Sequence, residues 1–111
     1  NTLIQAKFND ITLLSYTSRF AETYGIPEEL TMAKVEIGTG SCPGIKNEGI
    51  YKDNLIATYM LGPLLVANPD LAKWLLRRLG VESPELPFES ALYESYEAKR
   101  KEFQRPDLEL E

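Results

Sequence analysis

Few residues of this chain could act in catalysis, because its 111 residues include no histidine and one cysteine, Cys42. Without histidine the chain cannot form a Ser–His–Asp or Cys–His catalytic set, or a zinc site with imidazole ligands. We therefore expect no metal site and no cofactor. The acid–base chemistry that is left must use carboxylates, lysines or tyrosines.

Cys42 lies in Gly40-Ser41-Cys42-Pro43-Gly44, with proline beside it and no helical pattern after it. A nucleophile elbow needs a strand, a tight turn and then a helix whose N-terminus lowers the pKa of the thiol. The sequence therefore predicts a plain loop cysteine and no catalytic residue. Glu36 and Glu48, beside this glycine-rich loop, are a weaker alternative for carboxylate chemistry, since 17 acidic residues make chance pairs common.

Short apolar segments predict the strands that would position these residues. β-branched and apolar residues favour a strand at 11–16, and alternating apolar and charged residues favour one at 33–37. Two β-rich segments around Lys52-Asp53-Asn54 predict a hairpin. Glycines and a proline predict a loop at 38–44, and residues 58–65 are interpreted as a strand that ends in a Gly-Pro turn. We expect an α/β fold with short, mostly antiparallel strands.

Two C-terminal helices are expected after the strands. Asn68 suits an N-cap, Pro69 suits the first helical position and Gly80 suits a stop, so the sequence predicts a helix over 69–79. Its expected buried face consists of Leu71, Trp74, Leu75 and Leu79. A second, amphipathic helix is expected at about 88–104, with an apolar stripe made of Phe88, Leu92, Tyr96 and Phe103. That stripe could pack on the chain's own sheet or, as an alternative, dock in the groove of a partner protein.

A motif in the middle of the chain carries a resemblance. Its residues, in order, are Glu48-Gly49, Asn54, Thr58-Tyr59, Gly62-Pro63-Leu64-Leu65, Asn68-Pro69 and Leu71-Ala72. This pattern resembles the late segment of class I glutamine amidotransferase domains of the CobB/CobQ type, which include the glutaminase subunits of lipid II isoglutaminyl synthases. The position of that family's catalytic histidine falls on Leu61, which cannot transfer a proton.

The resemblance implies the C-terminal half of a flavodoxin-like amidotransferase domain, with residues 1–109 forming one domain or part of one. It also implies a module that is catalytically inactive by itself and binds an ATP-dependent ligase or synthetase subunit, or a small ligand at Thr58, Tyr59 and Gly62. A weaker resemblance at residues 14–20 suggests that Arg19 binds an anionic partner, although a surface arginine is the simpler interpretation. The Leu-Glu-Leu-Glu ending is typical of vector-derived residues, so Leu110 and Glu111 are left out of this prediction.

Charge, hydropathy and cysteine content limit the kinds of partner and location that we expect. The net charge is −5, and no basic stripe is interleaved with aromatic residues, which disfavours nucleic-acid binding. No apolar run approaches the roughly 20 residues that span a bilayer, so we expect no membrane insertion. One cysteine cannot form an internal disulfide, which favours a cytoplasmic location. An incomplete sheet has unpaired edges, so we expect a homodimer or association with a partner chain.

Overall fold

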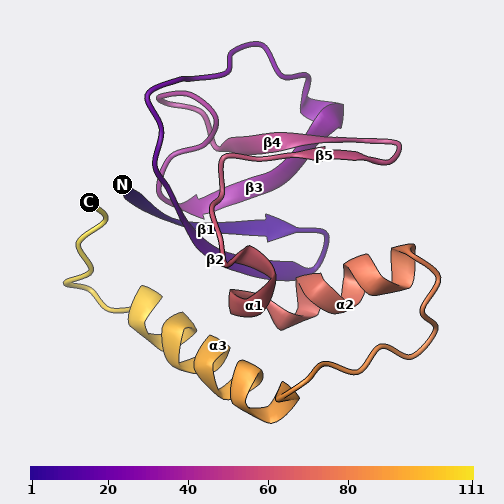
Figure 1. Cartoon of the computed structure of the whole chain (residues 1–111). Helices are drawn as coiled ribbons and strands as arrows, with labels where there is room; N and C mark the ends of the chain where they lie inside the picture. The colour runs from indigo at the N-terminus through magenta and orange to yellow at the C-terminus, as the bar shows by residue number, and fades with distance from the viewer. The chain divides into compact units, whose positions relative to one another are not determined.

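The structure, a computed structural model, describes all 111 residues, which form two compact units. Unit 1 comprises residues 1–61 together with 110–111, and unit 2 comprises residues 62–109. Unit 1 contains every strand and unit 2 every α-helix (Figure 1). No helix has the length and apolar character that crossing a membrane requires.

Unit 1 is a curled sheet of five antiparallel strands in the order β2-β1-β3-β4-β5 (Figure 1). The strands are β1 (Thr2–Phe8), β2 (Ile11–Thr17), β3 (Thr31–Ile37), β4 (Asn47–Lys52) and β5 (Leu55–Ala57), and the 3-10 helix η1 (Glu28–Leu30) precedes β3. After β5 the chain returns to β2, where Thr17 and Met60 form a bridge and the Leu61 N–H donates to the Tyr16 carbonyl at 3.0 Å. The chain thereby connects the two ends of the strand order.

The core of unit 1 follows from the two-residue period of its strands. Ile4, Ala6 and Phe8 alternate along β1 and are fully buried, and Ala6 pairs with the buried Leu13 of β2. The Phe8 ring lies 5.7 Å from that of Tyr51 on β4, centroid to centroid, in a tilted arrangement. These side chains hold the curled sheet around one apolar interior.

The expected strands at 11–16 and 33–37 and the hairpin around residues 52–54 are confirmed, with Asp53 in the left-handed region at φ 54°. Every strand pair is antiparallel, whereas a flavodoxin-like sheet is mostly parallel. The α/β class is confirmed, and the flavodoxin-like likeness stays a prediction.

The expected strand at 58–65 is wrong, because β5 ends at Ala57. Beyond it the Tyr59 N–H donates to a carboxylate, that of Glu48, and Pro63 has no N–H to donate. The four residues that follow form the short helix α1 (Leu64–Ala67), so the chain has three α-helices where two were expected.

The helix expected at 69–79 is confirmed as α2 (Pro69–Arg78), with Pro69 in its first turn. Asn68 occupies the N-cap position but makes no side-chain capping bond, and its Nδ2 donates to the Leu64 carbonyl at 2.9 Å. Leu79 is 73% exposed, so its expected burial is wrong: it lies past the last helical turn, at the C-cap, beside Gly80 at φ 101°.

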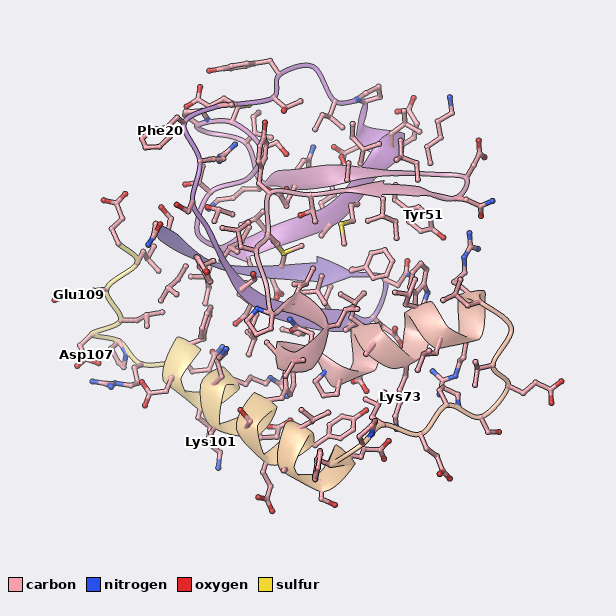
Figure 2. All side chains as sticks on the ribbon, viewed as in Figure 1. Phe20, Tyr51, Lys73, Lys101, Asp107 and Glu109 are labelled. Atoms are coloured by element: carbon pink, nitrogen blue, oxygen red, sulfur yellow. The ribbon has the colours of Figure 1, made fainter.

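The helix expected at 88–104 is confirmed as α3 (Glu89–Phe103), and two polar contacts join it to α2. Lys73 lies between the two helices (Figure 2) and pairs with Glu89 at 2.9 Å. The Tyr93 hydroxyl donates to Asp70 at 2.5 Å. Both contacts fix α3 against α2 within unit 2.

The four aromatic and aliphatic residues expected as one stripe on this helix differ in exposure. Phe88 precedes the helix in the left-handed region and is 85% exposed, Leu92 and Tyr96 are half-buried, and Phe103 is buried. Docking of this stripe to a partner stays a prediction, and Phe88 is its most accessible member.

Candidate functional site

A cavity of about 260 Å³ lies in unit 1, beside the β4–β5 hairpin. Part of its lining is apolar, from Ile26, Ile50 and Ala57. Four residues with hydroxyl groups, Thr23, Ser41, Thr58 and Tyr59, also line it, together with Gly49. Glu48 of β4 is the one carboxylate among the lining residues. The cavity therefore combines a small apolar pocket with one acidic group.

Glu48 is completely buried, and its two carboxylate oxygens have different surroundings. Oε1 accepts hydrogen bonds from the Thr58 hydroxyl at 3.1 Å and from the Tyr59 N–H at 2.9 Å. Oε2 is also buried, and no other group of the chain donates a hydrogen bond to it. An unsatisfied buried acceptor costs roughly 1–3 kcal/mol, and more when it is charged, so this oxygen requires an explanation.

Gly49, next to Glu48, is required by the backbone at this point. Its φ is 72°, and a Cβ there would lie 2.5 Å from the Ala57 carbonyl of the neighbouring strand. Its N–H donates to the buried Ser41 hydroxyl at 3.0 Å. The Glu-Gly pair of the motif thus places a carboxylate at the cavity and a close strand contact beside it.

Arg19 connects the segment before η1 to the glycine-rich loop. Its guanidinium donates to the carbonyls of Ser41 at 2.5 Å and Gly40 at 2.6 Å, and it lies 4.5 Å from the centroid of the Tyr59 ring. The Tyr59 hydroxyl shares a 2.8 Å hydrogen bond with Thr23. A cation over an aromatic face is attracted to it, so Arg19 holds both the loop and one wall of the cavity.

The glycine-rich loop folds back on the start of β4, which confirms the loop expected at 38–44. The Gly40 N–H donates to the Ile45 carbonyl at 3.0 Å, and a Cβ on Gly40 would lie 2.2 Å from the Asn47 carbonyl. Cys42 is buried in this loop, and the chain runs from it through a turn into β4 with no helix between. Its surroundings therefore lack the helix N-terminus that activates an elbow thiol.

Of the residues expected to bind a ligand, Thr58 and Tyr59 line the cavity, and Arg19 lies over the Tyr59 ring without lining the cavity itself. Gly62 does not line it and begins unit 2. Leu61, the position that the resemblance assigns to the family's histidine, is 38% exposed, and its carbonyl accepts from the Ser15 hydroxyl at 2.9 Å. Ligand binding by these residues stays a prediction.

The two glutamates considered for carboxylate chemistry differ sharply. Glu36 is exposed, accepts from Gln5 Nε2 at 3.1 Å and does not line the cavity, whereas Glu48 is buried and does. Sequence reasoning did not predict five of the lining residues: Thr23, Ile26, Ser41, Ile50 and Ala57. The glycine-rich loop was a signal for Ser41 alone. No group of three or more histidine, cysteine or acidic side chains is placed to hold a metal ion.

Comparison with curated proteins finds a partial match. Over 59 residues the chain is 37% identical to the lipid II isoglutaminyl synthase (glutamine-hydrolyzing) subunit GatD of Staphylococcus aureus (strain N315). The aligned region covers 53% of this chain and 24% of GatD, so the chain spans about a quarter of the length of the curated relative it matches. No family model matches, and no solved structure matches. The match supports a distant relation to this synthase subunit.

Proposed function

We propose that this chain is a glutamine amidotransferase-like module of the CobB/CobQ type that does not hydrolyse glutamine by itself and binds a small ligand in the Glu48 cavity. The partial match to GatD supports the amidotransferase-like assignment. The observation that carries ligand binding is the buried Glu48 Oε2, which has no hydrogen-bond partner and belongs to a residue lining the cavity. A fold gains nothing from an unsatisfied acceptor, whereas a ligand that donates to it removes the deficit.

Three features support the lack of hydrolysis by this chain. It contains no histidine. Its one thiol, Cys42, is buried in a turn. Leu61 stands where the motif of the related enzymes has its imidazole, and a thiol without a neighbouring base is a weak nucleophile at neutral pH. The chain therefore lacks both members of a Cys–His pair in working form.

The test is ammonia release from glutamine by the purified chain, measured alone and in the presence of a candidate ATP-dependent ligase or synthetase partner. We expect no release from the chain alone. Release that disappears in Cys42→Ala would overturn the assignment of Cys42 as a loop residue. Release that survives Cys42→Ala would place the chemistry on other residues and equally refute the proposal of an inactive module.

Association with a synthetase or ligase subunit is the second part of the proposal, because GatD is by its name a subunit of a synthase. An edge of the unit 1 sheet supports association: β5 is last in the strand order, and Leu55 is 58% exposed on it. Unpaired strand edges readily add a strand from another chain or from a second copy. Leu55→Lys should weaken complex or homodimer formation in light-scattering chromatography, and an unchanged mass would argue against this edge.

The alternative function is a protein-interaction domain that docks through α3. The 85% exposure of Phe88 favours it, since a large exposed aromatic side chain is typical of an interface anchor. Phe88→Ala should then abolish association while the chain stays folded. Retained association in this variant would remove the alternative.

A further inference from the structure

We propose that the Glu48 cavity is selective for small molecules that carry a primary ammonium group. This inference rests on the proposed function, since it names the ligand class of the same cavity. It follows from the charge, the hydrogen-bonding capacity and the size of the pocket.

The one acidic side chain of the cavity, Glu48, forms no ion pair. Glu48 is the one formally charged side chain that lines it. The guanidinium of Arg19, which lies over the Tyr59 ring, donates to the carbonyls of Gly40 and Ser41 and not to this carboxylate. Glu48 Oε1 has only neutral donors, and Oε2 has none. A cationic ligand supplies the missing charge, whereas an anionic ligand would be repelled.

The hydrogen-bonding groups fit an ammonium donor. A primary ammonium has three N–H donors and no acceptor. Glu48 Oε2 has the capacity to accept one of them. Thr23 and Tyr59, which line the cavity and share one hydrogen bond between their hydroxyl groups, are the candidate acceptors for the others. A hydrogen bond between two charged groups is about twice as strong as a neutral one. A neutral alcohol of the same length offers one weaker donor and no charge.

The size and the apolar lining set the rest of the ligand. A volume of about 260 Å³ lies below the 300–1,000 Å³ that is typical of pockets for drug-sized molecules. Ile26, Ile50 and Ala57 provide an apolar surface for a short aliphatic chain. The ligand class is therefore a small alkylammonium rather than a bare ammonium ion or a bulky amine.

Binding has a built-in reporter. Because Oε2 is shielded from solvent, a ligand can reach it only if the Glu48 carboxylate or a group beside it moves. Such a movement would change the surroundings of the 2.9 Å hydrogen bond from the Tyr59 N–H to Oε1. The amide signals of Glu48 and Tyr59 should consequently shift on binding.

The experiment is a titration of the ¹⁵N-labelled whole chain with three probes of equal length: n-butylammonium, n-butanol and n-butyrate. We expect saturable shifts of the Glu48 and Tyr59 amides with butylammonium, at an affinity at least about tenfold above that of butanol, and none with butyrate. Glu48→Gln should weaken butylammonium binding by about tenfold or more and leave butanol unchanged. Glu36→Gln, an exposed glutamate outside the cavity, is the matched control and should change nothing.

A second variant keeps the test independent of how Glu48→Gln folds. Ala57 lines the cavity from the exposed edge strand, so Ala57→Leu should fill the pocket and abolish butylammonium binding. Unchanged butylammonium affinity in either variant, or butanol or butyrate binding as tightly as butylammonium, would overturn the ammonium inference. If a neutral or anionic probe alone saturates the Glu48 and Tyr59 signals, ligand binding at the cavity stands and only its class is wrong. If no probe saturates these signals, both the proposed ligand binding at the cavity and the ammonium inference are wrong.

Discussion

Replacing Glu48 with glutamine should stabilise unit 1, which is an unusual expectation for a fully buried residue. The amide oxygen of glutamine can accept the same two hydrogen bonds that Oε1 accepts from Thr58 and Tyr59. The change removes a charged oxygen that has no partner and puts a neutral NH₂ in its place. A buried unsatisfied group costs roughly 1–3 kcal/mol, and a charged one more, so part of that cost is recovered. We expect the free energy of unfolding to rise by about 1 kcal/mol, or the midpoint temperature by roughly 4 °C.

The assay is urea unfolding followed through the amide NMR signals of β1 and β3, which report unit 1. Fluorescence of Trp74, the one tryptophan, reports unit 2 separately in the same samples. Glu36→Gln is the control and should stay within about 0.5 kcal/mol of the parent chain. Thr58→Val, which removes a donor to Oε1, should cost about 1 kcal/mol. A loss of 1 kcal/mol or more in Glu48→Gln would show that the carboxylate stabilises the fold, and the argument for a ligand at Oε2 would fail.

Four further outcomes are expected. Arg19→Ala removes two charged hydrogen bonds to the glycine-rich loop and should cost unit 1 about 2 kcal/mol in urea, with partial recovery in the lysine variant; an unchanged midpoint would contradict this. Phe8→Ala empties a fully buried position and should cost about 3–5 kcal/mol in the same assay. The hydrogen bond from Lys73 lowers the pKa of Glu89. The stabilisation that this carboxylate provides is therefore present above its ordinary pKa of 4.5 and is lost as the pH falls through the lower pKa of the folded state. Glu89→Gln should consequently reduce the loss of stability on the acid side of the stability–pH curve. Burial raises the pKa of Tyr93 above 10.0. The stabilisation that the neutral Tyr93 provides is therefore present below that pH and is lost as the pH rises through the pKa of the folded state. In Tyr93→Phe, the high-pH part of the tyrosinate absorbance titration should become smaller.

Local signals in the sequence predicted much of the fold. Pro69 and Gly80 bracket α2, and the polar turn around Asp53 marks the β4–β5 hairpin, because each signal acts on its own backbone. The strand β1 was missed although Ile4, Ala6 and Phe8 alternate along it. Its signal was the two-residue turn Asn9-Asp10, with Asn9 at φ 53°, between two period-2 segments.

The site was predictable only in part, since it depends on contacts between distant residues. Thr58 and Tyr59 were found through their place in a family motif. Thr23 and Ser41 were not, because the 2.9 Å hydrogen bond from the Thr23 N–H to the Ser41 carbonyl that joins their segments forms only in the folded chain. Whether an oxygen of Glu48 lacks a hydrogen-bond donor likewise depends on packing in the folded chain, so no pattern in the sequence predicts it.

The short stretch between β5 and the bridge to β2 limits how this protein can change in length. Only Thr58 and Tyr59 separate Ala57 from Met60, and both of them donate to Glu48. One inserted residue would displace Thr58 and Tyr59 relative to Met60, so either their hydrogen bonds to Glu48 or the Thr17–Met60 bridge would be lost. We therefore expect insertions to be tolerated at the tip of the β4–β5 hairpin and to be rejected three residues later.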